Sequence, residues 1–565
     1  MKQVRIGLAG LYNTRIDTTS TATSSGYVGI GVVGLMVVGK TTSASTKDRK
    51  YQNCFPHMID GEAWLLKRPG FGTANTPASG NIGTEIMIWT GQGTGQKVIT
   101  AYGGTNSTIY DGTTSLGAIT GKATGIKETF ISSEAALLIS STDNTAWYTT
   151  STAVTAAVTF TGDTHTNTTI DNISSTSGLL VGQIITGTGI QANTRIASID
   201  SGTAITTSIA TTATNSGVTI TRTILAKITD TDFPGNASYT LVGTFAHMDG
   251  FACIMTTDGK LWASDLNTLS AWTANSYDSA NAYPDKGTGC VRFKNFIITY
   301  GTESMQFWYN AGLTPFPFAK SISQTQKVGA LPGVADTIVS ISDTVFWIGT
   351  LPQGGLSIYQ FDGSISRISN PELDNTLLLV GPNNISLTTK REYGLSFVIV
   401  NCNLTTFVYC IEDKTWHEQT SLTRLWYKVA GLTIGTTIVN YSISNTSTSG
   451  KVYVTNPANF VYTDDGYAYK AVFQTERRDE GTNRRKFCSR VDLICDKEAN
   501  TSELTLMYSN DDYENFTTWG TLDLSSDSPK ATRLGSYRHR VWRGEHSANT
   551  PFRVKALEVQ LEVGQ

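Results

Sequence analysis

The stretch FACIMTTDGKLWASD, from Phe251 to Asp265, shows the pattern on which the fold prediction rests. An apolar run leads into the polar turn Thr-Asp-Gly-Lys, and a second run with a tryptophan follows it. Apolar and aromatic runs on both sides of an Asp-Gly turn are typical of a β-hairpin. The stretch therefore predicts two antiparallel strands.

Six further stretches repeat this layout of apolar strand, polar turn and aromatic-rich strand. They begin at Lys97, Ala135, Asn295, Thr344, Gly394 and Thr437. Apart from one gap, the spacing is roughly 40 to 50 residues, which is the period of a four-stranded propeller blade. The repeat predicts an all-β fold with a β-propeller of about six to eight blades, because one hairpin could lie outside the ring. A large β-sandwich with regular hairpins is the alternative.

Residues 152 to 224 fill the gap and are rich in threonine. Short β-branched stretches alternate there with Gly and Asn turns, for example in SGLLVGQIITGTGIQANTRIASID (Ser177–Asp200). Insertions succeed at exposed loop tips, so we predict a small β module on the outside, inserted between two blades. The regular alternation argues against a disordered linker.

The two ends of the chain differ from the repeat. After about residue 465 the predicted strands are longer and more charged, which is typical of a sandwich or a β-extension. The predicted organisation is an N-terminal β platform segment (1–75), the first blades (76–151), the inserted module (152–224), the remaining blades (225–464) and a C-terminal β platform or sandwich (465–565).

Composition restricts the function classes. The 565 residues carry a net charge of −3, and only 16% are charged, so a surface that grips nucleic acid electrostatically is not expected. The 7 cysteines form no CxxC pair, which disfavours a zinc ribbon and predicts free thiols in a protein made in a reducing cytosol. The apolar run Val28–Val38 is too short to span a bilayer, and no signal peptide opens the chain. We therefore expect neither membrane insertion nor standard export.

No motif for a nucleotide, metal or other cofactor is convincing. GLMVVGKT, from Gly34 to Thr41, matches the P-loop pattern, but loop and strand material follows it where a phosphate-binding helix should begin. The six histidines are scattered and show no metal-ligand spacing. We expect no cofactor and no metal.

Carboxylates for glycan hydrolysis should form a pair in a cleft, and the candidates do not. Asp258, Asp362 and Asp413 lie in short predicted turns, where Asp is favoured because its side chain bonds to the backbone. We therefore predict that the protein is not an enzyme.

One further motif bears on glycans. YSNDDYENFTTW (Tyr508–Trp519) is similar to the Asp box of sialidase-type propellers, although the Gly is missing. Ser509, Asp511 and Trp519 are expected to hold a hairpin there. A propeller that binds or cleaves glycans, on a virion or a cell surface, remains the alternative function.

The N-terminal segment STKDRKYQNCFPHMIDGEAWLLKRPGF (Ser45–Phe71) resembles a family of short-tailed phage (podovirus) proteins, the packaged-DNA stabilisation and tail-nozzle group, also called tail tubular protein B. The positions that carry the resemblance are Asp48, Arg49, Tyr51, Asn53, Phe55, Pro56, Lys67, Arg68, Pro69 and Gly70. DEGTNRRK (Asp479–Lys486) and GSYRHRVWR (Gly535–Arg543) are similar to the C-terminal motifs of that family, as is the Asp-box-like stretch. The sequence departs from the family at the missing Gly and at the inserted module.

The resemblance implies a structural protein of the virion tail, assembled in the host bacterial cytoplasm. It implies a homo-oligomer, a hexameric ring with a DNA channel on its axis, below the portal and adaptor proteins. Tail fibre, spike or needle proteins would lie at its sides or below. Genomic DNA would pass without sequence-specific binding, and a weakly acidic chain suits sliding DNA because it does not grip phosphates.

Arginine is the residue expected at the contacts between subunits, because its guanidinium pairs with a carboxylate through two bonds. In R-P-G we expect Pro69 to set φ, Gly70 to allow a positive φ, and Arg68 to pair across an interface. The other arginines expected at contacts with neighbours or the adaptor are Arg477, Arg478, Arg484, Arg485, Arg533, Arg538, Arg540 and Arg543. The alternative is an exposed hairpin with solvated charges.

Overall fold

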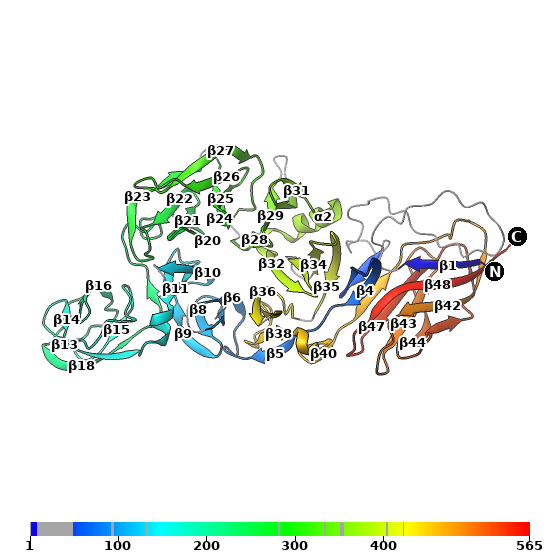
Figure 1. Cartoon of the computed structure of the whole chain (residues 1–565), viewed down its shortest axis with the longest axis horizontal. Coiled ribbons are helices and arrows are strands. Elements are labelled where there is room, and N and C mark those ends of the chain that lie inside the picture. Colours follow the sequence, from blue (N-terminus) through cyan, green and yellow to red (C-terminus); the bar gives the residue numbers. More distant parts are fainter. Residues whose placement is uncertain are drawn as a thin grey trace.

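The computed structural model describes residues 2–7, 49–91, 95–131, 134–280, 283, 285–332, 335–350, 355–402, 405–421, 423–434 and 436–564. A propeller occupies the middle of the molecule, with a small β module at one end and a β-sandwich at the other (Figure 1). Asp48 and the P-loop-like string Gly34–Thr41 lie outside the described residues.

Six separate four-stranded sheets and four strands of a larger sheet form the blades of the propeller in the described part of the chain. The first blade is β6 (Gly83–Trp89), β7 (Lys97–Tyr102), β8 (Ser107–Asp111) and β9 (Thr114–Ile119); the second is β10 (Ala123–Ile131), β11 (Glu134–Ser141), β12 (Ala146–Thr150) and β19 (Ala226–Lys227). The third is β20 (Leu241–Met248), β21 (Phe251–Thr256), β22 (Lys260–Ser264) and β23 (Trp272–Ser279); the fourth is β24 (Gly287–Phe293), β25 (Phe296–Gly301), β26 (Met305–Asn310) and β27 (Phe318–Gln326). The fifth is β28 (Ile338–Ile341), β29 (Thr344–Thr350), β30 (Leu356–Phe361) and β31 (Ile365–Arg367); the sixth is β32 (Ile385–Glu392), β33 (Leu395–Cys402), β34 (Thr405–Cys410) and β35 (Thr415–Gln419); the seventh is β36 (Lys428–Ile434), β37 (Thr437–Ile443), β38 (Val452–Thr455) and β5 (Gly72–Asn75).

The ring closes through the first strand of each blade. β6, β10, β20, β24, β28, β32 and β36 contact one another in this order, and β36 returns to β6. The all-β propeller prediction is thus confirmed, with seven blades among the described residues. Each of the seven hairpins found in the sequence supplies the second and third strands of one blade. These two strands carry many of the blade's buried aliphatic and aromatic residues, which is why the sequence pattern is clear there.

A strand from the N-terminal segment completes the last blade. β5 pairs with β38, with Tyr453 opposite Thr73 and Val454 opposite Gly72. Residues 72–75, expected in a platform segment, therefore belong to the propeller.

The threonine-rich residues form a separate six-stranded sheet, at the far left of Figure 1. Its strands are β13 (Thr159–Thr164), β14 (Thr169–Asp171), β15 (Ile185–Thr186), β16 (Ile196–Ser201), β17 (Ala204–Thr207) and β18 (Asn215–Arg222), after the short helix α1 (Ser151–Thr155). A core of its own, with Ile170, Ile185 and Ile205, is fully buried. The module is inserted inside the second blade, between β12 and β19, which corrects the expected position between two blades.

Both chain ends build a single sandwich, instead of two separate platforms. One sheet holds β1 (Lys2–Gly7), β3 (Cys54–Ile59), β4 (Glu62–Lys67), β42 (Lys486–Cys495), β45 (Lys530–Thr532), β46 (Ser536–Tyr537) and β48 (Arg553–Val563). The other holds β2 (Lys50–Gln52), β41 (Ala471–Gln474), β43 (Glu503–Ser509), β44 (Thr517–Asp523) and β47 (Val541–His546). Residues from both ends, such as Leu65, Phe473 and Trp542, share one buried core.

A parallel pairing joins the sandwich to the propeller. Gln52 of β2 pairs with Glu418 of β35, so the sixth blade and one sandwich sheet form a continuous nine-stranded sheet. The helix α2 (Pro371–Val380) packs Leu373 and Leu377 against the fifth and sixth blades. No helix among the described residues is long and apolar enough to cross a membrane.

Removing the inserted module should leave a folded propeller and sandwich. The ends of the module meet where Arg222 N donates to Val158 O at 2.8 Å, so a short Gly-Ser linker can replace residues 158–222. We expect a cooperative thermal transition and an unchanged β-type circular dichroism spectrum after allowance for the lost residues. Deletion of the matched hairpin Phe251–Ser264 should abolish that transition, because it removes two buried strands of a blade. Loss of the transition on deleting the module would show that the second blade depends on it.

Candidate assembly site

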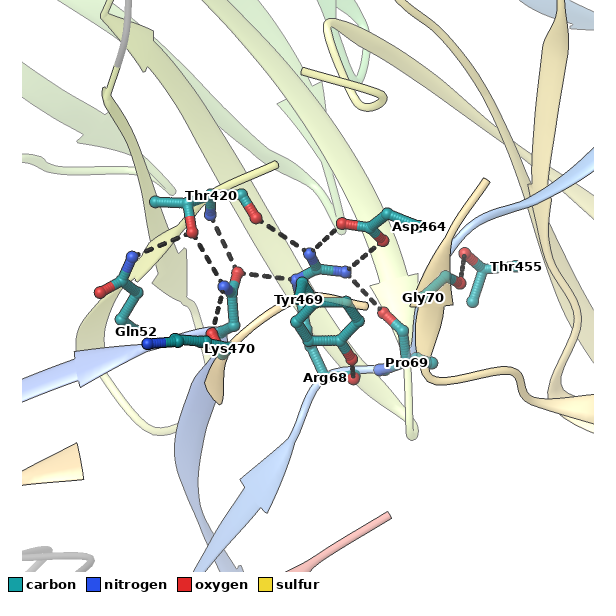
Figure 2. A network of polar contacts seen from close by, with 10 residues as sticks. Gln52, Arg68, Pro69, Gly70, Thr420, Thr455, Asp464, Tyr469 and Lys470 are labelled. Carbon is teal, nitrogen blue, oxygen red and sulfur yellow. Dashed lines mark hydrogen bonds and ion pairs between the residues drawn. The ribbon is translucent and has the colours of Figure 1, made fainter. Parts of the chain in front are cut away.

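Arg68 lies in a closed pocket within one chain, with 1% of its surface exposed. Its Nη1 and Nη2 donate to Oδ1 and Oδ2 of Asp464 at 3.0 and 2.6 Å (Figure 2). The remaining donors reach Asn53 Oδ1, Pro69 O and Thr420 O at 2.9 to 3.1 Å. This geometry corrects the expected pairing of Arg68 across a subunit interface.

Aromatic rings complete the environment of the guanidinium. Its carbon lies 3.8 Å from the centre of the Tyr469 ring and 5.0 Å from that of Trp426. Burial alone would lower the pKa of Arg68, but Asp464, Tyr469 and Glu392 together outweigh burial, so the pKa is raised and the side chain stays charged. A buried charge of this kind is tolerated only when it is paired and hydrogen-bonded, as it is here.

Asn53 supplies the second half of the network. Its backbone is left-handed, with φ at 55°, a conformation that asparagine adopts more readily than most residues. Its Oδ1 accepts from Arg68 Nε and from Thr420 N, and its Nδ2 donates to Thr420 Oγ1 and Lys470 O. Asn53 thereby fixes Thr420, at the end of the sixth blade, to Lys470, which directly precedes β41 of the sandwich.

Gly70 is required for a reason that the sequence does not show. It does not have the expected positive φ. Instead, a Cβ at Gly70 would lie 2.1 Å from Thr463 O and 2.7 Å from Thr463 C, so only glycine fits. Gly70 N donates to Val461 O at 2.6 Å, which ties the segment entering the propeller to the segment leaving it.

The other N-terminal candidates are also structural within the chain. Tyr51 and Pro56 are buried in the sandwich, and Arg49 Nη2 lies 3.5 Å from Glu476 Oε1. We name the set Arg68, Asp464, Asn53, Thr420 and Gly70 the clasp. It joins the strand that enters the propeller, the segment that leaves it, and the sixth blade.

In the C-terminal motif, Lys486 holds a loop from inside. Its buried Nζ donates to Thr482 O, Arg484 O and Arg538 O at 2.7 to 3.0 Å. The side chains of Arg484, Arg485 and Arg538 are exposed around this point. Because one ammonium group binds three backbone carbonyl groups, it holds the backbone that carries these arginines in place. We name Arg484, Arg485 and Arg538 the arginine edge.

The remaining C-terminal arginines differ in their environment. Arg540 is 1% exposed, donates to Asn510 Oδ1 and Leu534 O, and stacks on Tyr508 and Tyr537, so its expected contact with a neighbour is corrected. Arg477 is exposed and pairs with Asp512. Arg478 pairs with Glu476, Arg543 pairs with Glu545, and Arg533 is exposed with φ at 60°.

The carboxylates predicted to lie in turns do so. Thr256 Oγ1 donates to Asp258, Ser364 N donates to Asp362, and Asp413 lies between β34 and β35, 3.1 Å from His57 Nδ1. Among the described residues, no group of three or more His, Cys, Asp or Glu could hold a metal ion. All seven cysteines are free thiols, six of them buried.

The Asp-box-like hairpin is held as expected. Asp511 Oδ1 accepts from Ser509 Oγ at 2.6 Å and from Asn515 N at 3.0 Å, which closes the turn between β43 and β44. Trp519 Nε1 donates to Thr532 O at 2.9 Å. The motif therefore acts as a staple of the sandwich.

A short turn of the chain lies at the centre of the propeller. The single turn η1 (Ala335–Thr337), between the fourth and fifth blades, contacts β10, β20 and β32 across the ring. Thr337 is fully buried there. This turn occupies the position where many propellers have a central channel.

Residues 181–431 match the family model described as "Bacteriophage P22 Gp10, beta-propeller". The match supports a relation to phage short-tail and stabilisation proteins at a coarse level, and a structural role in a virion in preference to an enzymatic one. No protein with a curated function is significantly similar in sequence.

The solved structures that match this chain include three with low identity and low TM-scores. The WD40 domain of Neurospora crassa Pan2 is 10% identical, with a TM-score of 0.32 over 71% of this chain and 97% of that chain. BBS1N in complex with ARL6DN is 11% identical, with a TM-score of 0.32 over 68% and 96%. A chain of the mitotic checkpoint complex is 10% identical, with a TM-score of 0.33 over 69% and 93%.

Replacing Arg68 by alanine should destabilise the whole chain. The change leaves Asp464 buried without its partner, for which we expect a loss of about 3 to 5 kcal/mol in the free energy of unfolding. Chemical denaturation of the purified variant measures this loss. Lys497→Ala is the matched control, because Lys497 and Asp527 form an exposed pair and its removal should have no measurable effect. Equal stability of Arg68→Ala and wild type would rule out the clasp as a stabilising element.

Acid should destabilise the sandwich through His546. Burial and the neighbouring Lys67 ammonium lower the pKa of His546 to about 3, so the folded state holds it neutral. Its stabilising contribution is complete above the unfolded pKa of about 6.5 and is lost as the pH falls toward 3. Between pH 7 and pH 4 we expect the wild type to lose about 3 kcal/mol more than His546→Gln, measured by urea denaturation. Parallel pH profiles of the two proteins would contradict this.

Proposed function

We propose that the protein is a structural component of a short phage tail, a ring-forming nozzle or hub below the portal and adaptor proteins. The observation that carries the proposal is the match of the propeller region, residues 181–431, to the phage family model. The motifs at both chain ends that resemble the same family support it. In the structure these motifs meet in one sandwich, although they are far apart in the sequence.

The DNA channel would lie on the axis of a hexamer, between copies of the chain. The position of η1 supports this arrangement, because this turn lies among the inner strands at the centre of the propeller. The low net charge of −3 suits a channel through which genomic DNA slides without sequence-specific contacts. This channel would help to retain the genome and then release it.

The sandwich would carry most contacts with neighbours, the adaptor above, and fibre, spike or needle proteins. The arginine edge supports this view, since three exposed guanidinium groups extend from a backbone fixed by Lys486. Exposed Phe487, at 51%, follows Lys486 directly, and aromatic residues beside arginine are typical of protein interfaces.

Charge reversal at the arginine edge should weaken the ring. Negative-stain microscopy and analytical ultracentrifugation of the full chain, alone and with its adaptor, should show a closed ring of six copies. In the double variant Arg484→Glu, Arg485→Glu, the free energy of assembly should become less favourable by about 2 to 5 kcal/mol per desolvated contact. This loss would be seen as a higher protein concentration needed for ring formation.

Lys497→Glu provides the control, because it changes the charge of an exposed sandwich residue outside the arginine edge and should assemble like the wild type. Wild-type assembly by the double variant would place the interface elsewhere on the chain. A stable monomer that cleaves glycans would overturn the proposed function itself.

A further inference from the structure

Three charged side chains from distant segments meet where the propeller ring closes. Lys428 begins β36 in the last blade, Glu85 lies on β6 in the first, and Asp336 lies in η1 at the centre. Lys428 Nζ is 2.5 Å from Asp336 Oδ1 and 3.5 Å from Glu85 Oε1. One amine therefore touches two carboxyl groups.

The three side chains are largely enclosed, and further polar contacts hold them in place. The exposed fractions of the Lys428, Glu85 and Asp336 side chains are 12%, 10% and 21%. The Tyr427 hydroxyl donates to Asp336 Oδ2 at 3.1 Å, so the second carboxyl oxygen also has a donor. Val429 N donates to Thr388 Oγ1, which holds the backbone beside Lys428 in place.

The protonation state of Glu85 suits proton transfer in a reaction between the Lys428 amine and the Asp336 carboxyl group. Burial raises the pKa of Glu85 to about 7, with Lys428 opposing the shift and Asp336 adding to it, so Glu85 is partly protonated near neutral pH. Burial lowers the pKa of Lys428, but Asp336 and Glu85 outweigh burial, so the resting pair is ionic. Transfer of one proton within the ion pair, from Lys428 to Asp336, precedes the reaction and, with Glu85 protonated, leaves three neutral groups.

We propose that Lys428 and Asp336 join in an intramolecular isopeptide bond, with Glu85 transferring the protons. The neutral Nζ attacks Asp336 Cγ, and the C–N bond forms while a tetrahedral centre carries the developing charge on Oδ2, which the Tyr427 hydroxyl stabilises. The protonated Glu85 relays the protons: its carbonyl oxygen accepts one from the nitrogen while its hydroxyl gives one to Asp336 Oδ1, the departing oxygen. The C–O bond breaks, one water leaves, and no oxidant or second reactant is needed.

Position makes the reaction efficient and useful. The folded chain holds the amine and the carboxyl within reacting distance, which replaces an encounter between separate molecules. The bond would fasten the last blade to the central turn, beside the first blade, at the seam of the ring. It concerns the chain alone and holds whether or not the proposed tail ring forms.

The test is the intact mass of the purified full chain after denaturation. We expect the mass of the sequence less one water, and a protease digest should contain a branched peptide that joins Lys428 to Asp336. Lys428→Arg keeps the positive charge but cannot form the amide, so it should have the unmodified mass. Glu85→Gln should slow bond formation in freshly synthesised chains by about 10²- to 10⁴-fold, the usual contribution of a general acid and base, measured as the fraction of bonded chains against time after synthesis.

A second buried pair provides an internal control. Lys390 Nζ lies 2.6 Å from Glu392 Oε2 with both side chains at most 3% exposed, and among the described residues it ion-pairs with that carboxylate alone. No branched peptide should contain Lys390. An unmodified wild-type mass after complete folding would overturn the bond, and an unchanged rate in Glu85→Gln would overturn the role of Glu85.

Discussion

The buried ion pair between Arg68 and Asp464 is the interaction on which the rest of the structure depends. Its two partners are 396 residues apart, and they bring together the segment that enters the propeller and the one that leaves it. Removing two charges from water costs several kcal/mol for each ion, so such a pair persists only with nearly every donor satisfied. Asn53, Thr420 and Pro69 provide the remaining acceptors, which explains the dense composition of this segment.

From the clasp, order extends in two directions. Toward the propeller, Gly70 passes against the Thr463 backbone and leads directly into β5, the strand that completes the last blade. Toward the sandwich, β2 lies between β35 and β41, so that the sixth blade and one sheet of the sandwich are continuous. The same short segment therefore completes the last blade and joins the sandwich that carries the arginine edge.

The sequence predicts the local parts of this fold well. The seven hairpins could be found because each is formed by neighbours in the chain, with a polar turn between two apolar runs. The Asp511 staple and the turn aspartates could be found for the same reason. Pairings between distant segments could not, since nothing beside Arg68 in the sequence points to Asp464, and nothing beside β38 points to β5.

Two of the errors have different physical origins. Arg68 and Arg540 were expected at interfaces because arginine often pairs between subunits, but composition does not reveal burial, and both are enclosed within the chain. The module was expected between blades because the fourth strand of the second blade, β19, has only two residues and leaves no clear pattern. Arg484, Arg485 and Arg538 are exposed, as both the predicted contact with neighbours and the alternative of a solvated hairpin require.

The way in which β5 completes the last blade has a consequence for synthesis on the ribosome. Residues 50–75 emerge early, yet their partners on β38, β41 and β48 emerge only near the end of translation. Pairings so distant in sequence are slow to form, since the entropy of closing a long loop must be met before they stabilise anything. The nascent chain therefore exposes unpaired strand edges for most of its elongation, and such edges are prone to aggregate. A helper that shields the first strands, or prompt release of the finished chain, would govern how much protein reaches the folded state.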